Sequence, residues 1–134
     1  MSVVVDSSVL VALTSDTGPV GRWAENLFAS ESLVTPHLAL VEATNVLRRL
    51  ELAGKLERLE AASAVADLLA INLRLLPFAP FADRVWELRA NITSYDALYV
   101  AIAEQLDMPL ATLDRKLADS SGARCRFLLP SIHL

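Results

Sequence analysis

The feature that constrains the fold most is a very short apolar run that ends in an acid. Val3, Val4 and Val5 are followed directly by Asp6. A run that is apolar at every position suits a strand buried on both faces of a parallel sheet. A second run of this kind, 109–113, ends at Asp114. We therefore expect buried parallel strands, two of which have an acid at the carboxyl end.

Helical patterns separate the expected strands. Thr35 is expected to cap a long helix that has Pro36 at its first position and ends at Gly54. Short apolar strands that alternate with helices predict an α/β fold with a mainly parallel sheet flanked by helices. The expected strands are 3–5, 32–34, 75–77, 109–113 and 126–129. The expected helices are a short one around 9–13, then 20–29, 36–53, 56–72, 81–90, 93–106 and 115–121.

The composition fits one compact domain that spans residues 1–134. The chain is 54% apolar and 21% charged, which excludes a disordered protein, and its length suits one core rather than two. The formal charge of −4 argues against a protein that coats nucleic acid by bulk positive charge.

The sequence also carries expectations about the cellular compartment. No basic segment precedes the first apolar run, and the single Cys125 has no cysteine to pair with, so neither a secretory signal nor a disulfide is expected. The uncharged stretches are far shorter than the roughly 20 residues that span a bilayer. We therefore expect a cytoplasmic protein with no membrane partner.

Four acids are expected to meet at one edge of the sheet. In an open α/β sheet the ligand crevice lies at the carboxyl ends of the strands, where Asp6 and Asp114 fall. Asp96 lies in the first turn of a helix that begins on the same side, and Glu42 interrupts a largely apolar helical segment. Each acid also has a structural interpretation. Asp6 and Asp114 suit simple helix caps, and Asp96 suits the acid of a capping box that begins at Thr93.

Glu42 has polar neighbours on one face of its helix. Asn45 and Arg49 follow at i+3 and i+7, so the three residues form a polar stripe. The plain interpretation is a solvated face with a weak ion pair between Glu42 and Arg49, and the alternative is a functional carboxylate. The spacing alone leaves both open.

A cluster of acids needs a compensating cation. Two carboxylates about 4 Å apart repel by roughly 4 kcal/mol at an effective dielectric constant near 20. Hard divalent ions such as Mg²⁺ or Mn²⁺ prefer oxygen ligands, whereas His37, His133 and Cys125 have no spacing typical of a zinc site. Because Mg²⁺ commonly meets substrate phosphates, the acids suggest metal-assisted phosphodiester hydrolysis.

Four segments in this order resemble a known family. The chain resembles a PIN domain, and within that group a VapC-like ribonuclease toxin of a type II toxin–antitoxin system. The resemblance runs nearly end to end, and it implies a three-layer fold with a short-stranded, mainly parallel sheet between helices. The segments that carry it are 3–8, 42–45, 93–101 and 112–117.

The resemblance implies a mechanism and partners. It implies an endoribonuclease that holds Mg²⁺ or Mn²⁺ and hydrolyses RNA by in-line attack of metal-activated water. It also implies a homodimer that a cognate VapB-like antitoxin holds inactive. The residues implied for catalysis and metal binding are Asp6, Glu42, Asp96 and Asp114. The residues implied to lie beside the metal or the substrate are Ser7, Asn45, Thr112 and Arg115, with Arg89 as a further candidate.

One alternative to the enzyme belongs to a different functional class. A non-catalytic α/β module that binds RNA or a partner protein would keep the same acids as caps and members of ion pairs. Such a module would bind its partner without a divalent ion, which distinguishes it from the enzyme.

Overall fold

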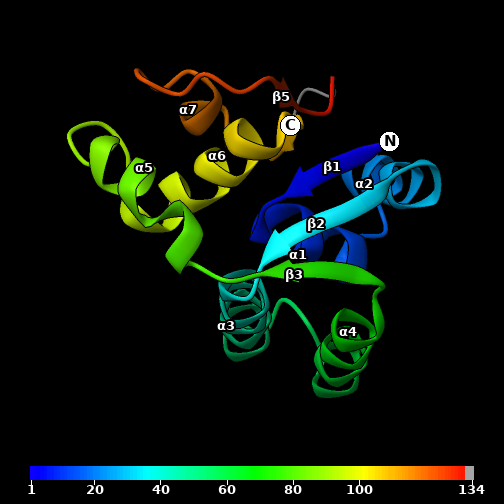
Figure 1. Ribbon diagram of the computed structural model, residues 1–134. Helices are drawn as coiled ribbons and strands as arrows, with labels where there is room; N and C mark the ends of the chain where they lie inside the picture. The colour runs from blue at the N-terminus through cyan, green and yellow to red at the C-terminus, as the bar shows by residue number, and fades with distance from the viewer. Residues whose placement is uncertain (132–134) are drawn as a thin grey trace.

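The molecule is built around a parallel five-stranded sheet in the order β3-β2-β1-β4-β5. The computed structural model describes residues 1–131, and every neighbouring pair of these strands is parallel. The predicted α/β class is therefore confirmed (Figure 1). The strands are β1 (Ser2–Val5), β2 (Ser32–Pro36), β3 (Leu73–Leu76), β4 (Leu110–Ala111) and β5 (Phe127–Leu128).

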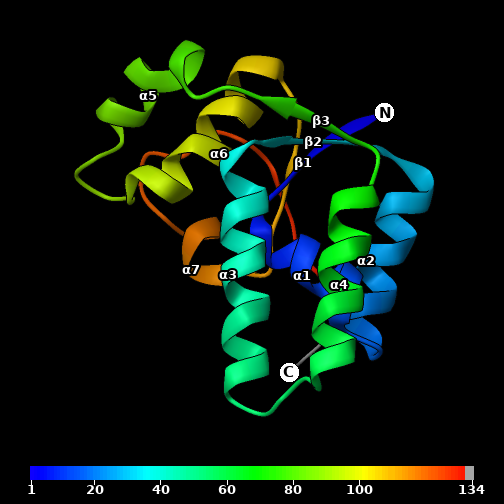
Figure 2. The ribbon, with the colours of Figure 1, turned by 90° about the horizontal axis from the view of Figure 1, so that it is seen from below.

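Helices cover both faces of the sheet. One layer holds the helices that precede β3, and the other holds those that follow it (Figures 1 and 2). The first layer contains α1 (Ser7–Ser15), α2 (Pro19–Ser30), α3 (Leu38–Leu52) and α4 (Arg58–Ala70). The second contains the 3₁₀ turn η1 (Ala79–Phe81), α5 (Ala82–Glu87), α6 (Ser94–Leu106) and α7 (Arg115–Ala118).

The strand order places a topological switch point between β1 and β4. The chain adds β2 and β3 on one side of β1, then returns to add β4 and β5 on the other. Because parallel crossovers are right-handed, reversing the direction moves the later helices to the opposite face. Ligands of open α/β sheets bind at such a switch point, beyond the carboxyl ends of the strands. Asp6 follows β1 directly at this edge.

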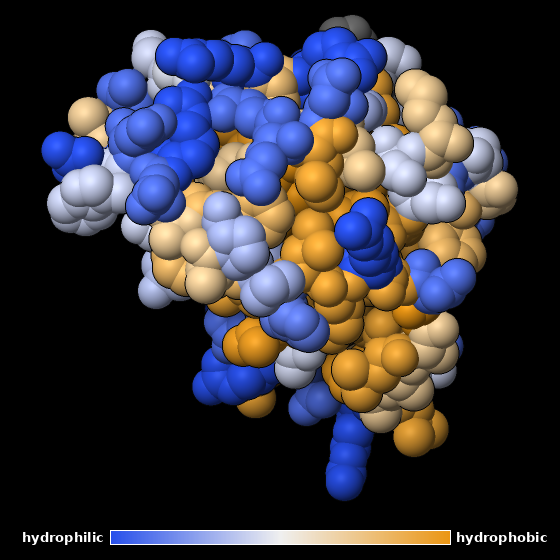
Figure 3. Space-filling view, viewed as in Figure 1, coloured by the Kyte–Doolittle hydropathy of each residue, from blue (hydrophilic) through white to orange (hydrophobic). Residues whose placement is uncertain are grey.

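The most hydrophobic elements form the centre of the core. Val3, Val4 and Val5 of β1 are fully buried, as the unbroken apolar run predicts. In α6 every residue from Ala97 to Ala103 is buried, which is typical of a helix covered on all sides. On the face shown in Figure 3, apolar residues gather over β2 and β3, and polar residues surround α5.

The structure corrects several predicted boundaries. Pro36 pairs with Leu76 in the sheet, so α3 begins at Leu38 with His37 as its N-cap, and Thr35 is not a cap. The Thr35 hydroxyl instead donates a hydrogen bond of 2.7 Å to the Val5 carbonyl. Gly54 does end this region in the left-handed conformation, with φ of 74°.

Four further predictions had the wrong bounds. The segment 81–90 is a 3₁₀ turn, the short α5 and turns; 109–113 has strand pairing only at 110–111; and 115–121 is helical only to Ala118. β3 covers 73–76 rather than 75–77. Within residues 1–131 no helix combines the length and the hydropathy needed to cross a membrane.

Candidate active site

Asp6 lies at the centre of the candidate site. Its carboxylate is only 6% exposed and caps α1. One oxygen, Oδ1, accepts hydrogen bonds from the Ser8 hydroxyl at 2.5 Å and from the Val9 N–H at 3.3 Å. The other, Oδ2, accepts a bond of 2.5 Å from the hydroxyl of Thr112, which is completely buried. These bonds hold the carboxylate in a single orientation.

The two hydroxyls that contact Asp6 also bond the segment after β4, Ser8 from across the switch point and Thr112 from within that segment. Ser8 accepts a bond of 3.1 Å from the Leu113 N–H, and Thr112 accepts one of 3.0 Å from the Asp114 N–H. The start of α1 and the segment after β4 are therefore tied together at the switch point. Thr112 was expected beside the site, whereas Ser8 was not. Its position two residues after a capping Asp is the signal that identifies it, since hydroxyls there bond locally.

The carboxylates of Asp6, Asp96 and Asp114 influence one another. Burial raises the pKa of Asp6, with a further contribution from the charge of Asp96, against the hydrogen bonds that favour the ionised form. Burial also raises the pKa of Asp96, and the charge of Asp114 adds to this effect. Asp6, Asp96 and Asp114 thus form an electrostatically coupled acidic centre.

No cation of the protein pairs with this acidic centre in the part of the chain that the structure describes. The ion pairs among residues 1–131 involve Glu31, Glu87 and Glu104 instead. A buried carboxylate without a compensating charge is costly. The centre is therefore chemically suited to a cation from solution.

The capping interpretation of the acids is correct in part. Asp114 caps α7 by accepting bonds from the N–H groups of Lys116 and Leu117 at 2.9 and 3.2 Å. At α6, Thr93 accepts a bond of 3.2 Å from the Asp96 N–H. Within residues 1–131 the Asp96 carboxylate accepts no hydrogen bond from the Thr93 backbone N–H, so the capping box is incomplete.

Glu42 approaches the same region from α3. It is half-buried and accepts a hydrogen bond from the phenol of Tyr99, a residue of α6 that is only 1% exposed. Burial raises the pKa of this phenol, and the bond to Glu42 and the charges of Glu42 and Asp6 raise it further. The nearby Ser7 side chain acts in the opposite direction and lowers the pKa of the phenol. Tyr99 was not predicted at the site, although it lies one helical turn after Asp96.

The remaining predicted residues make no hydrogen bond or ion pair with the acids of the centre within residues 1–131. Asn45 and Arg49 are exposed, and within residues 1–131 Arg49 makes no ion pair with Glu42. Exposed Arg115 donates a bond of 3.2 Å to the Pro130 carbonyl. Arg89 stacks over the Trp86 ring at 4.5 Å. His133 lies outside the described residues.

The donor chemistry fits a hard divalent ion. Every side chain of the acidic centre offers oxygen, as Mg²⁺ and Mn²⁺ require. Within residues 1–131, however, no three His, Cys, Asp or Glu side chains are close enough together to form a ready ligand cluster. Mg²⁺ keeps several of its waters when it binds, so direct contact with one or two carboxylates and contact through water with the others is compatible with this spacing.

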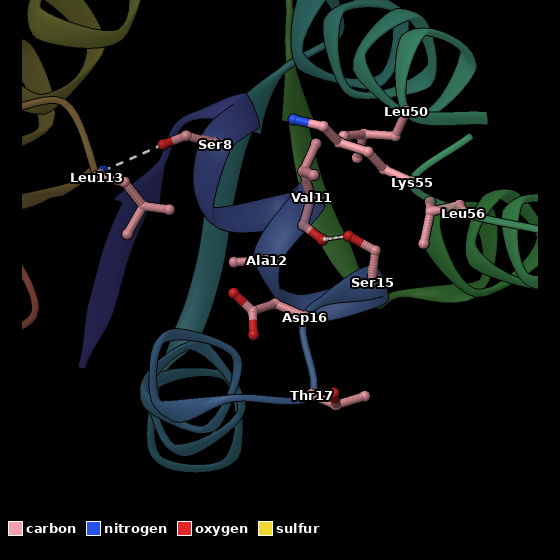
Figure 4. Close-up of a pocket in the computed structure, with 10 residues that line it drawn as sticks. All are labelled: Ser8, Val11, Ala12, Ser15, Asp16, Thr17, Leu50, Lys55, Leu56 and Leu113. Carbon is pink, nitrogen blue, oxygen red and sulfur yellow. Dashed lines mark hydrogen bonds between the residues drawn. The ribbon is translucent and has the colours of Figure 1, made fainter. Parts of the chain in front are cut away.

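A pocket of about 400 Å³ adjoins the site. It extends from Ser8 along α1 to the connection between α3 and α4, where Lys55 supplies the cation of its lining. Figure 4 shows Lys55 reaching into the pocket and Ser8 bonded to Leu113. The pocket meets the site through Ser8, which bonds Asp6, and has room for part of a larger ligand.

Comparison with known proteins agrees with this architecture. The family model described as PIN domain matches residues 3–122. A VapC ribonuclease of Mycobacterium bovis is 36% identical over 123 residues, which cover 92% of this chain and 94% of the relative.

Two solved structures have the same fold. A protein of Pyrobaculum aerophilum shares 30% identity and a TM-score of 0.66, over 93% of this chain and 89% of its own. VapBC2 of Rickettsia felis, bound to a DNA fragment from its promoter, has a TM-score of 0.65 at 16% identity, over 95% of this chain and 98% of its own. The resemblance inferred from the sequence is confirmed: the chain belongs to the PIN-domain family and has VapC ribonucleases among its relatives.

Proposed function

We propose that the protein is a divalent-metal-dependent endoribonuclease, the toxin of a toxin–antitoxin pair. The observation that carries this proposal is the Asp6 carboxylate, which is buried, fixed by two hydroxyls, and next to Asp96 without a compensating cation. The ribonuclease relative, 36% identical along nearly its whole length, supports RNA as the substrate.

The proposed ligands of the ion are Asp6, Asp96 and Asp114, with Glu42 as the fourth catalytic carboxylate. Mg²⁺ or Mn²⁺ bound there would polarise a phosphoryl oxygen and make water a better nucleophile. Ser8 and Thr112 keep both oxygens of Asp6 oriented, and the cap of α7 does the same for one oxygen of Asp114. The chain thus supplies oriented carboxylate oxygens that can hold the ion, and the ion would neutralise the phosphate.

The partners of this toxin would be RNA, a VapB-like antitoxin and a second copy of the chain. The R. felis structure, which contains VapBC2, supports an antitoxin partner. Exposed apolar side chains support association, and among them are Val41 of α3, Phe78 after β3 and Trp86 of α5. Asn45 and Arg115 are proposed to contact RNA, because both are exposed and polar.

The test is cleavage of total RNA by purified protein with Mg²⁺, with Mn²⁺ and with EDTA, followed by mapping of the ends. We expect metal-dependent cuts that leave 5′-phosphate and 3′-hydroxyl ends and that disappear in Asp6→Asn, which keeps the side-chain size but removes the charge. Induced expression of the wild type, but not of Asp6→Asn, is expected to stop bacterial growth.

Two results would contradict the proposal. Full cleavage by Asp6→Asn would exclude Asp6 from the reaction. RNA binding that needs no divalent ion and leads to no cleavage would favour the non-catalytic module.

A further inference from the structure

Tyr99 connects the two helix layers at the carboxyl edge of the sheet. It belongs to α6, and its partner Glu42 belongs to α3 on the opposite face (Figure 1). The two helices can meet only beyond the strand ends, which is where Asp6 lies. The charge of Asp6 acts on the Tyr99 phenol, so the phenol lies within the electrostatic reach of both acids.

We propose that Tyr99 is a positioning residue that holds the Glu42 carboxylate in place for the reaction. This inference rests on the proposed function, because it assigns a role within the same site. The phenol donates to Oε1 of Glu42 and leaves Oε2 free of any hydrogen bond recorded within residues 1–131. One oxygen is thereby anchored, and the other is available to an ion or a water molecule.

The side chain of Tyr99 is rigid, whereas the side chain of Glu42 is flexible. Glutamate has three rotatable side-chain bonds and loses much of its freedom when it is held. Tyr99, in contrast, is 1% exposed and lies in the fully buried segment of α6. A phenol fixed in this way can keep a half-buried carboxylate in one orientation before any ligand arrives.

The same arrangement occurs at Asp6. There the buried hydroxyl of Thr112, which comes from the later half of the chain, donates to an acid of the earlier half. Tyr99 and Glu42 repeat this relationship, because α6 follows β3 and α3 precedes it. Both acids from the first half of the chain are therefore held by hydroxyls from the second half.

A buried phenol requires a hydrogen-bond partner in any protein, so the bond alone is compatible with a merely structural role. The two roles differ in what the hydroxyl controls. A structural hydroxyl affects stability only. A positioning hydroxyl affects the metal affinity and the turnover number, and it acts only when Glu42 is present.

The test variant is Tyr99→Phe, which removes the hydroxyl and keeps the ring. Its matched control is Tyr95→Phe on the same helix, because Tyr95 is 61% exposed. We expect Tyr99→Phe to lower the Mn²⁺ affinity, measured by calorimetry without RNA, by about 10-fold, as is usual when a group that orients a ligand is lost. We expect kcat to fall by about 10-fold or more while KM for RNA stays within about twofold. Tyr95→Phe should match the wild type in all three quantities.

A double-mutant cycle separates action through Glu42 from other effects. In the Glu42→Gln background, Tyr99→Phe should cause almost no further loss of Mn²⁺ affinity or kcat. Additive losses would overturn the inference, and so would a Tyr99→Phe protein that has a lower Tm but unchanged Mn²⁺ affinity and kcat. A wild type that neither binds Mn²⁺ nor cleaves RNA would instead overturn the proposed function.

A second measurement uses protein in which Tyr99 keeps its ring and its hydroxyl. The chain has two tyrosines, so 3-fluorotyrosine labelling yields two ¹⁹F resonances. Titration of the labelled protein with Mg²⁺ should shift the Tyr99 resonance, and Glu42→Gln should abolish this shift. In protein that calorimetry shows to bind Mg²⁺, a Tyr99 resonance that does not shift, or that shifts equally in Glu42→Gln, would contradict the positioning role.

Discussion

At the scale of single residues, the candidate site contains a buried carboxylate whose negative charge no cation among residues 1–131 compensates. Asp6 is buried and hydrogen-bonded, and at the same time it lies near the negative charge of Asp96. Sites that prepare charged groups for chemistry commonly show perturbed pKa values of this kind. This uncompensated burial should have a measurable effect on the free energy of unfolding.

Asp6→Asn is expected to stabilise the metal-free protein at pH 7, by about 1 kcal/mol or roughly 3–5 °C in Tm. Burial raises the pKa of Asp6 above its ordinary value of 3.8, so between pH 3.8 and the folded-state pKa the folded state retains a proton that the unfolded state has released. With respect to this group, stability is highest below pH 3.8 and falls as the pH rises through the folded-state pKa. The gain from Asp6→Asn should therefore shrink as the pH is lowered toward 4.

Thermal unfolding in EDTA between pH 4 and 8 measures this difference. The variant must also lose the stabilisation that Mn²⁺ confers on the wild type. An Asp6→Asn protein that is less stable than the wild type at pH 7 in EDTA would show that the hydrogen bonds of the carboxylate outweigh the cost of its burial.

At the scale of elements, a hydrogen-bonded ion pair fastens α5 and the segment 122–124 to α6. Arg84 donates bonds of 2.7 and 3.2 Å to the two carboxylate oxygens of Glu104, and a third of 2.8 Å to the Gly122 carbonyl. Glu104 also accepts a bond of 2.7 Å from the Arg124 N–H. This network fixes α6, which carries Asp96 and Tyr99 at its other end.

Glu104→Gln is expected to cost about 1–2 kcal/mol of unfolding free energy at pH 7, as for other charge-assisted hydrogen bonds. Burial alone would raise the pKa of Glu104, but the bonds from Arg84 and Arg124 outweigh it and lower the pKa below 4.5. The contribution of ionised Glu104 to the free energy of unfolding is thus complete above pH 4.5 and is lost as the pH falls through the folded-state pKa of Glu104.

Urea unfolding at pH 7 and at pH 3 tests this expectation, with the exposed ion-pair partner Glu87→Gln as the control. Glu104→Gln should lose more unfolding free energy at pH 7 than at pH 3. Glu87→Gln should lose almost none at either pH, since exposed ion pairs contribute little. Equal losses for both variants would contradict the assignment of the network to Glu104.

At the scale of the whole molecule, the sequence predicted the layers better than the site. The unbroken Val3–Val5 run and the alternation of strands with helices were enough for the parallel sheet, because burial on both faces demands such runs. Pro36 was misassigned, because a proline that suits the first turn of a helix also suits the end of a strand.

The contacts within the site were less predictable. The four acids could be predicted because a charged residue within or directly after an apolar segment is easy to recognise in a sequence. Tyr99 was missed because its role arises from a contact across the sheet edge with Glu42, whereas the place of Ser8 two residues after Asp6 was a usable local signal. Local spacing does not predict a contact between residues that lie 57 positions apart, as Glu42 and Tyr99 do.

The central claim is that the switch point between β1 and β4 binds a divalent ion through its carboxylates. Diffraction from crystals soaked in Mn²⁺, recorded for its anomalous signal, tests this claim most directly. We predict a peak between Asp6 and Asp96 that is absent from crystals of Asp6→Asn. A fully active protein whose anomalous map is empty at this position, or whose only peak lies elsewhere, would contradict the account.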